Sequence, residues 1–439
     1  MQKSKLILRV LLVAFWIRMT IGYVAQMVIP ALADVLPHVY LLFDAVVVTL
    51  GCWTMKRRRD MAVVAVVIAV TALSTLLVNR YSLLFYLNGM RDFISFMFVI
   101  PILNFFLSDD KLRDQFVATV ERHLFMYLVV QAPCTITQFI RFGATDPVGG
   151  SLGENYSGIT STLIYLVSFY LLQRRLDRDR LWVSLLENKW LIILLFPTFL
   201  NETKVSLVYL AMYMLLMIPL GRKTFRYTVL AVPMFALVFY GGMTAYVVAT
   251  GGTQGDVFSL DYYMEGYLLS EDAESTERLA KWMLENDSDG EAGGLTGDVP
   301  RLTKLVVLGE LVDEPSTLIA GNGVGHFKGG TLVDNSEFYR DNEWVMTGTI
   351  PYVFHLLVQL GVLGVLLEIF FFVVYLWFPP MPGMRRNYNL QLYLFALVLL
   401  LQLYNDSLRN AFFTLIVFFV MLMSWQKSEP DAVEGVELS

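Results

Sequence analysis

The chain has few charged residues and few cysteines. Only 16% of its 439 residues are Asp, Glu, Lys or Arg, whereas soluble domains carry about 25%. The two cysteines, Cys52 and Cys134, each lie in or beside an apolar run, which excludes a disulfide framework and a cysteine-rich metal site. The four histidines show no HExxH or His-x-His spacing. We therefore expect no metal and no other cofactor.

Long apolar runs take the place of the missing charge. Hydrophobic residues make up 56% of the chain, and they gather in stretches such as Met61–Val78 and Pro351–Phe378. A run of about 18 or more apolar residues predicts a helix that crosses the ~30 Å hydrocarbon core of a bilayer. The composition thus predicts an all-α polytopic membrane protein whose main surroundings are lipid, with no nucleic-acid partner.

The apolar runs predict about 12 transmembrane helices. The seventh is short and is expected to be a broken or re-entrant element. The first follows Lys3, Lys5 and Arg9 but is longer than the apolar region of a signal peptide, so we interpret it as an uncleaved helix. The expected spans are 8–28, 36–55, 61–78, 92–107, 124–140, 157–173, 189–200, 205–220, 228–249, 350–378, 389–404 and 411–426.

The basic residues predict the orientation of the chain in the membrane. Short cytoplasmic loops are rich in Lys and Arg. With the N-terminus inside, the inner segments hold 21 basic residues, while the short outer segments hold only Arg80, Arg91, Arg141, Lys204 and Arg409. This alternation predicts a bacterial inner-membrane protein with both termini in the cytoplasm.

The exception to the short loops is residues 250–349, which the topology places in the periplasm. This segment has 19 Asp and Glu against 6 Lys and Arg. Helical periodicity is expected at 273–285 and 300–312, with a Gly- and Asp-rich connector at 287–297. A long, partly helical loop is usually functional. The expected domains are transmembrane helices 1–9 at 1–249, this loop, transmembrane helices 10–12 at 350–426 and a cytoplasmic tail at 427–439.

The outer basic residues are the first candidates for chemistry. Arg80 is interpreted as an anchor to lipid headgroups, and the same interpretation stays open for Arg409. Arg91 and Lys204 each have an acid beside them in the chain, so a local ion pair is the plain alternative. The functional hypothesis is that both bind an anionic headgroup such as a diphosphate, because Arg and Lys hold phosphate oxygens strongly in a partly dry site.

The large loop supplies the other candidates. Three glycines in Gly321–Phe327 suit a tight turn or a close approach of the backbone to a ligand, and His326 follows them. Arg278 and Arg301 each open a predicted helix, where an Arg opposes the helix dipole and therefore needs another partner, either a local acid or a phosphate. Glu343 precedes the tenth span and is either a base or one more solvated carboxylate.

Taken in order, these motifs resemble the O-antigen polymerase/O-antigen ligase family. Gly89–Arg91 precedes a span, as in the family. Gly150–Asn155 lies outside just before a span, as the family's G-x-x-x-N segment does. Lys204 stands beside Thr203 at the start of a span, and Arg301 precedes the glycine-rich segment by about twenty residues. The span that follows contains Gln359–Gly364, which is similar to the family's G-x-x-G.

The resemblance implies a metal-independent glycosyltransferase on a GT-C-like membrane fold. The substrate would be an oligosaccharide linked to undecaprenyl diphosphate, and a chain-length-determining co-polymerase is a possible partner. Arg91, Lys204, Arg301 and Arg278 would bind the diphosphate, and His326 and Glu343 would lie near the acceptor hydroxyl. Asn155, Asn322 and Trp344 are weaker candidates for glycan contacts. Many members carry a His-Asn pair where this chain has Ile350–Pro351, so the base is left to Glu343 or His326.

Three other functions stay open. A ligase would use the same chemistry on a different acceptor. A transporter or flippase would need ionisable residues along a path through the membrane, and the expected spans offer chiefly Arg18 and Asp44. A structural assembly partner is the third alternative. We predict a polysaccharide polymerase at the periplasmic face.

Overall fold

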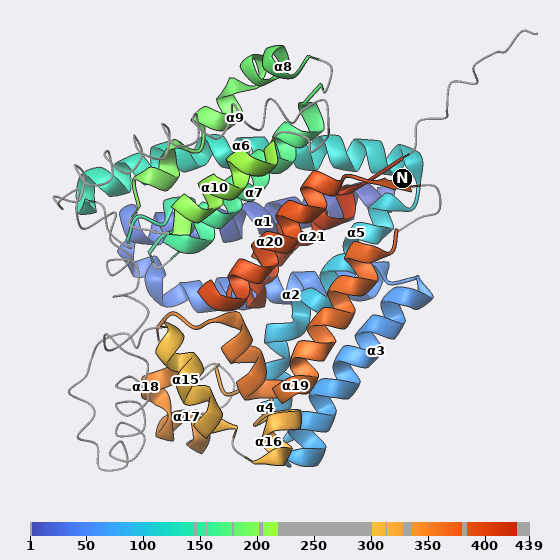
Figure 1. Cartoon of the computed structure of the whole chain (residues 1–439), viewed down its shortest axis with the longest axis vertical. Coiled ribbons are helices and arrows are strands. Elements are labelled where there is room, and N and C mark those ends of the chain that lie inside the picture. The colour runs from blue at the N-terminus through green and yellow to red at the C-terminus, as the bar shows by residue number, and fades with distance from the viewer. Residues whose placement is uncertain are drawn as a thin grey trace, which may run out of the picture.

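The computed structural model is almost entirely helical (Figure 1). It describes residues 2–143, 147–154, 156–177, 180–201, 205–217, 301–312, 314–327, 336–346, 348–379 and 384–427. The expected span at 228–249, the expected helix at 273–285 and the expected tail beyond Lys427 lie outside these residues. The helix expected at 300–312 is present as α15, which runs from Arg301 to Leu311.

The helices follow the apolar runs closely, because each run must satisfy its own backbone hydrogen bonds in lipid. The N-terminal half contains α1 (Gln2–Met27), η1 (Pro30–Val35), α2 (Leu36–Thr54), α3 (Arg58–Ala72), η2 (Leu73–Val78), α4 (Leu83–Gly89), η3 (Met90–Phe93), η4 (Ser95–Val99), α5 (Ile100–Leu107), α6 (Asp110–Phe142), η5 (Gly150–Leu152), α7 (Ser157–Arg175), α8 (Leu181–Glu187), α9 (Lys189–Ile193), η6 (Phe196–Phe199) and α10 (Val205–Met217).

The C-terminal part holds the described helices of the large loop and three further apolar helices. Its elements are α15 (Arg301–Leu311), α16 (Pro315–Ala320), α17 (Glu337–Asp341), α18 (Glu343–Met346), α19 (Tyr352–Phe372), η9 (Val373–Trp377), β1 (Met384–Arg386), α20 (Tyr388–Tyr404), η10 (Ser407–Arg409), α21 (Ala411–Met423) and β2 (Trp425–Lys427). The strands β1 and β2 pair antiparallel.

Several of these helices are suited to a membrane. Among the described residues, five helices are long and apolar enough to cross a bilayer, and a sixth span results if the bent pair Leu83–Phe93 and Ser95–Leu107 is counted as one. Four shorter apolar helices accompany them, at Lys189–Phe199, Val205–Met217, Tyr388–Tyr404 and Ala411–Met423. The chain is therefore a helical membrane protein, and the number of 12 spans stays a prediction.

One of these shorter helices, α21, lies in the centre of the bundle. All 13 residues of α21 are buried, and α21 packs against α7, α5, η4, η9 and η10. At ~1.5 Å per residue, α21 is about 20 Å long, which is less than the hydrocarbon core. Because protein surrounds it on every side, it does not have to match the thickness of the lipid.

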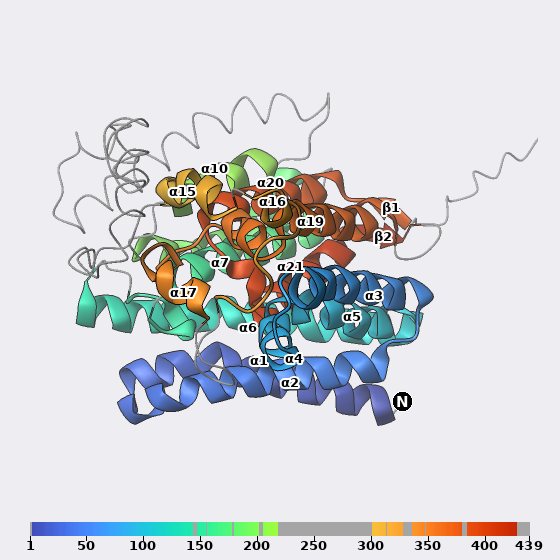
Figure 2. The same cartoon turned by 90° about the horizontal axis from the view of Figure 1, so that it is seen from below.

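The two ends of the bundle differ in character. The N-terminus, the turns between α2 and α3 and between α5 and α6, and the strands β1 and β2 all lie toward one end (Figures 1 and 2). These segments carry several of the predicted cytoplasmic basic clusters, among them Lys56–Arg59 and Arg385–Arg386. The helices α4, α15, α16, α17 and α18 lie away from them, together with the first half of α19 (Figure 1). We call this second region the loop end.

Two helices bend at the loop end, and glycine explains the bend in α19. The pair Leu83–Phe93 and Ser95–Leu107 is bent by 62°, where a short 3₁₀ segment ends at Phe93. Within α19, Gly361 has φ 58° and ψ −152°, a conformation that a residue with a Cβ rarely adopts. A Cβ at Gly361 would lie 2.5 Å from the carbonyl oxygen of Leu318, so α16 packs directly on the bend.

Replacing Gly361 tests how far this bend supports the fold. Gly361→Ala introduces both a strained φ and a steric clash, and we expect it to lower the stability by roughly 2 kcal/mol or more. The matched control is Gly309→Ala in α15, where nothing lies within 4 Å of the added Cβ; Ala there stabilises the helix or leaves it unchanged. Thermal unfolding of the purified proteins measures both effects, and equal midpoints for the two variants would contradict the role given to Gly361.

Candidate functional site

The candidate site lies where three backbone segments meet at the loop end. A Cβ added to Gly89, at the end of α4, would lie 2.4 Å from the backbone nitrogen of Gly325. A Cβ at Gly321 would lie 2.3 Å from the carbonyl carbon of Gln359 in α19. The glycine-rich segment 321–327 therefore packs backbone to backbone against the bent span on one side and α19 on the other. Its glycines permit this close approach.

Polar contacts fasten the same segment to the end of α3. The Asn79 side-chain amide donates to the carbonyl of Gly321 at 2.9 Å, and the Val324 backbone N–H donates to the Thr75 hydroxyl at 2.9 Å. The hydroxyl of Ser74 donates to the carbonyl of Ala320. These three residues belong to or follow η2, a π-helical end of α3. The Gly321–Phe327 segment is thus a rigid wall of the site rather than a free loop.

A buried carboxylate, Asp92, joins the surrounding elements. Its Oδ1 accepts from Nε of Arg409 at 3.3 Å. Its Oδ2 lies 3.4 Å from Nε2 of His355 and accepts from the Gln359 amide at 3.2 Å. The side chains of Asp92 and His355 are each 1% exposed. We call Asp92, His355, Gln359 and Arg409 the Asp92 network.

Arg409 extends this network toward the glycine-rich segment. Its Nη1 donates to Asp406 at 2.5 Å and its Nη2 donates to the carbonyl of Phe327 at 3.3 Å. The side chain of Arg409 is 12% exposed, and that of Asp92 is 1% exposed. Two carboxylates and one carbonyl therefore contact the three nitrogens of the Arg409 guanidinium. The sequence left Arg409 open as a lipid anchor, and the structure gives it three polar and ionic partners, Asp92, Asp406 and the carbonyl of Phe327.

Arg91 belongs to a second, neighbouring ion pair. Although Asp92 follows it in the chain, the Nη2 of Arg91 lies 3.3 Å from Oδ2 of Asp44 on α2. Arg91 and Asp44 are 14% and 17% exposed. Arg91 thus pairs with a carboxylate that is distant from it in the chain. The adjacent residues Arg91 and Asp92 of η3 therefore pair with two different elements. Arg91 pairs with α2 and Asp92 pairs with η10.

Arg301 reaches the same end of the bundle from the large loop. Its guanidinium carbon lies 4.8 Å from the ring centroid of Tyr404, the last residue of α20. The next turn of α15 is fixed by Lys304, which is buried and donates to the carbonyl of Thr349 at 3.1 Å. Tyr404 leads directly into the segment that carries Asp406 and Arg409. The structure therefore brings Arg301 to the chain segment that forms the Asp92 network.

His326 has a packing role in this structure. It is 2% exposed and its ring lies against those of Tyr81, Phe85 and Phe338. Nε2 is 2.8 Å from the carbonyl of Asn322, and a carbonyl only accepts, so Nε2 carries the proton. Nδ1 then accepts from the Ser336 hydroxyl at 2.7 Å. Neither nitrogen is open to an acceptor hydroxyl, so the geometry does not favour the predicted acid–base role.

The other predicted residues of the loop divide into exposed and structural ones. Glu343 is exposed on α18, and its charge adds to burial in raising the pKa of Tyr339. Trp344 is half-buried against a small apolar cluster that includes Val307, and its Nε1 is buried with no hydrogen-bond partner. Asn322 donates its amide to the carbonyl of Leu311 at 3.2 Å, which makes it a structural residue of the glycine-rich segment.

The predicted candidates outside the described residues are Lys204, Arg278 and Asn155.

The sequence interpretation missed the Asp92 network as a unit. Its members come from positions 92, 355, 359 and 409, so no local motif contains them. Two signals were present: an acid inside an otherwise apolar run, and a His and a Gln four residues apart, which places them on one helical face. Among the residues that the structure describes, no three His, Cys, Asp or Glu side chains are grouped to hold a metal ion.

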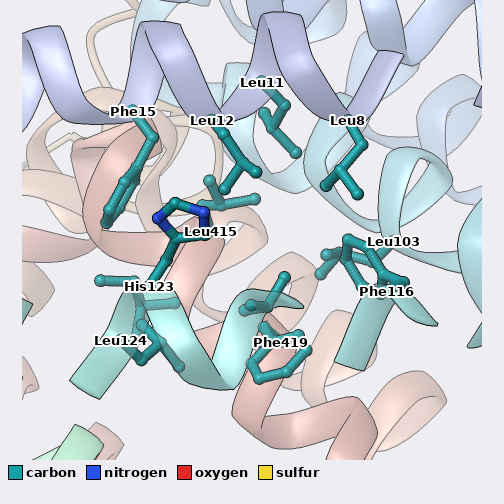
Figure 3. A pocket seen from close by; sticks show the side chains of 12 residues that line it. Leu8, Leu11, Leu12, Phe15, Leu103, Phe116, His123, Leu124, Leu415 and Phe419 are labelled. Atoms are coloured by element: carbon teal, nitrogen blue, oxygen red, sulfur yellow. The ribbon is translucent and has the colours of Figure 1, made fainter. Parts of the chain in front are cut away.

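Two apolar hollows lie elsewhere in the bundle. A void of about 40 Å³ between α1, α5, α6 and α21 is lined by apolar residues and by His123 (Figure 3); Nδ1 of His123 accepts from the Trp16 indole at 2.9 Å. A larger groove of about 690 Å³ runs along α19 and α20, with the Glu368–Gln402 pair, 2.8 Å apart, in its wall. The first is a packing void, and the mainly apolar lining of the second suits a lipid chain.

Comparison with known proteins gives no further guide. No protein-family model matches the chain, and no curated protein is significantly similar to it. The resemblance to the O-antigen polymerase/O-antigen ligase family therefore rests on the short motifs quoted above and stays a prediction.

The buried imidazole of His326 makes stability depend on pH. Burial lowers its pKa from 6.5 to about 4, although the hydrogen bond to Asn322 acts in the opposite direction. The folded protein then binds fewer protons than the unfolded chain. The contribution of neutral His326 to the stability is therefore complete above the ordinary histidine pKa and is lost as the pH falls toward 4. A shift of this size is worth roughly 3 kcal/mol.

We therefore expect the unfolding midpoint to fall between about pH 8 and about pH 5, and to fall less in His326→Gln. Thermal unfolding in detergent at both pH values measures the difference. The matched control is His38→Gln, because His38 is exposed and its loss should leave the pH dependence unchanged. Identical pH profiles for the wild type and His326→Gln would show that the histidine is not held neutral by the fold.

Proposed function

We propose that the chain is a membrane glycosyltransferase that polymerises a lipid-linked glycan at the loop end of the bundle. The observation that carries the proposal is the pair of arginines Arg91 and Arg409, whose side chains are 14% and 12% exposed and which each pair with a carboxylate. Arg91 lies on η3 and Arg409 lies on η10. The two are linked because Asp92, the residue after Arg91, pairs with Arg409. Such an arrangement suits an anion that approaches from the surface.

The proposed anion is the diphosphate of an undecaprenyl-linked oligosaccharide. When the glycosidic bond to the lipid breaks, negative charge develops on the diphosphate, and fixed cations that stabilise it lower the barrier. Arg91 and Arg301 are proposed to stabilise this charge, and Arg409 is added because of its position. Lys204 and Arg278 are proposed to take part as well. In this mechanism the guanidiniums supply the positive charge that a metal ion supplies in other transferases.

The buried members of the Asp92 network have a supporting role in this proposal. Asp92 holds Arg409 in place, and His355 and Gln359 hold Asp92. With exposures of 1% or less, these three side chains have no direct access to a substrate, so we treat them as positioning residues. They keep the guanidinium of Arg409 from rotating away from the site.

The acceptor side of the reaction is proposed to involve α18. Glu343 is exposed and follows the helix that packs on His326. It is therefore placed to accept a proton from a sugar hydroxyl, whereas His326 has no open nitrogen. The neighbouring Trp344 has a half-buried ring. Sugars stack on aromatic rings, which supports a glycan at this surface.

The proposed setting is a bacterial inner membrane with the loop end in the periplasm. Several basic clusters belong to segments at the opposite end, where the N-terminus and the β1–β2 pair lie (Figure 2), and this supports a cytoplasmic face there. A lipid-linked glycan presented on the outer leaflet would then meet the cations from the membrane side. A chain-length-determining co-polymerase is a further proposed partner.

Removing the cations tests the proposal in cells. Arg91→Gln, Lys204→Gln and Arg301→Gln should each abolish long-chain glycan, because losing one charge-assisted contact slows the transfer by roughly 10- to 100-fold. The readout is the chain-length ladder of the surface glycan on a gel, with immunoblotting of the membrane fraction to show that each variant inserts. Arg141→Gln is the matched control, since Arg141 is an exposed arginine outside the proposed site. Normal ladders in all three variants would end the assignment.

Loss of the protein separates polymerase from ligase. Without a polymerase, single repeat units still reach the acceptor; without a ligase, none do. Transfer of labelled repeat units by the purified protein in detergent separates both from a transporter, which transfers none.

A further inference from the structure

Arg18 is a buried cation that pairs with no carboxylate among the residues the structure describes. It lies on α1 and is 3% exposed. Its Nη2 donates to the phenol oxygen of Tyr156 at 3.1 Å, whereas Nη1 is buried and has no hydrogen-bond partner. The described acids form no ion pair with it, in contrast to Arg91 and Arg409. The function proposed above makes no use of this residue.

Three aromatic rings surround the guanidinium. Its central carbon lies 3.6 Å from the ring centroid of Tyr40, 4.0 Å from that of Phe412 and 5.2 Å from that of Tyr156. Each cation–π contact is worth about 2 kcal/mol when desolvated. A charge without a partner in a membrane protein costs at least this much and up to several times more. The rings therefore offset only part of the cost, and the positive charge remains uncompensated.

Arg18 lies next to the proposed site rather than in a remote part of the bundle. Tyr40 is one turn of α2 away from Asp44, the partner of Arg91. Phe412 is three residues after Arg409. Two ring neighbours of Arg18 thus lie close in the chain to residues of the proposed site, Tyr40 to Asp44 and Phe412 to Arg409. Arg18 is about 14 Å along α1 from the helix end at Met27.

The orphaned nitrogen and the missing counter-charge are what an unoccupied anion site would show. We propose that Arg18 is an anion-binding residue at the floor of the site, and that it binds a phosphate of the lipid-linked substrate through Nη1. This inference rests on the function proposed above. The phosphate reaches Nη1 when the ring of Tyr156 moves aside; Tyr156 is partly exposed and immediately precedes α7.

The energetic consequence separates a binding role from a structural one. If Arg18 only filled the aromatic cage, replacing it with an uncharged side chain would lower the stability of the free protein. If Arg18 is kept for a ligand, removing its uncompensated charge leaves the free protein equally stable or makes it more stable, because a buried charge is often replaced by an apolar residue without loss. In that case the variant keeps or gains stability and loses ligand binding.

The experiment uses the full-length purified protein in nanodiscs. Thermal unfolding is measured alone and with undecaprenyl diphosphate, with additional phosphatidylglycerol, or with inorganic phosphate. The variants are Arg18→Met and Arg18→Lys, and the matched control is Arg9→Met, an exposed arginine on the same helix. Arg18→Lys keeps the charge but not the planar fork of donors, so it should recover part of the binding.

We expect undecaprenyl diphosphate to raise the midpoint of the wild type and of Arg9→Met. Arg18→Met should have an equal or higher midpoint without ligand, and an affinity at least about 10-fold lower. A lower midpoint without ligand together with unchanged affinity would overturn the inference and leave the proposed function standing.

Failure of the proposed function gives a different pattern. If the prenyl diphosphate does not bind but phosphatidylglycerol or inorganic phosphate binds in an Arg18-dependent way, the substrate is wrong and the anion site remains. If none of the three probes gives a response that depends on Arg18, the anion site itself is refuted.

Discussion

The loop end of this protein depends on the charge of one buried carboxylate. Asp92 lies in a short 3₁₀ segment inside an apolar span, where an isolated charge would be expensive. It is compensated by Arg409 from the segment before α21, and it also contacts His355 and Gln359 on α19. Three regions that are distant in sequence are held together through its two oxygens. Breaking such a buried pair by removing one partner costs about 3–5 kcal/mol, so the position of Arg409 is coupled to the integrity of the fold.

Glycine provides the shape that this charge network requires. The bent span, the glycine-rich segment and α19 approach one another so closely that a single Cβ at Gly89, Gly321 or Gly361 would collide with backbone atoms. Irregular backbone at membrane depth is tolerated only where protein covers it, and here each irregular segment is covered by the next. The bends in turn place polar side chains at an end of the bundle where straight helices would present only apolar ones.

The sequence predicted the helices well and the site only in part. Apolar runs located the described apolar helices, and the periodicity after Pro300 located α15, because these patterns reflect local contacts with lipid or with one helix face. The pairing of charges was not readable, since Arg91 meets Asp44 and Asp92 meets Arg409 across 47 and 317 positions. His326 was expected near an acceptor because of its glycine-rich neighbours, and only its three-dimensional surroundings reveal that both ring nitrogens are occupied. Lys204, Arg278 and Asn155 lie outside the described residues.

The complete burial of α21 has a consequence for how the bundle is assembled. The helices that enclose it, among them α1, α5 and α7, come earlier in the chain and are synthesised first. Until α21 is inserted, their inner faces have no protein to pack against, so lipid or a chaperone must occupy the centre. The final packed arrangement therefore forms after synthesis of the C-terminal part, and the segment bearing Arg409 is positioned in that same late step. Assembly of the proposed site and closure of the bundle are one event.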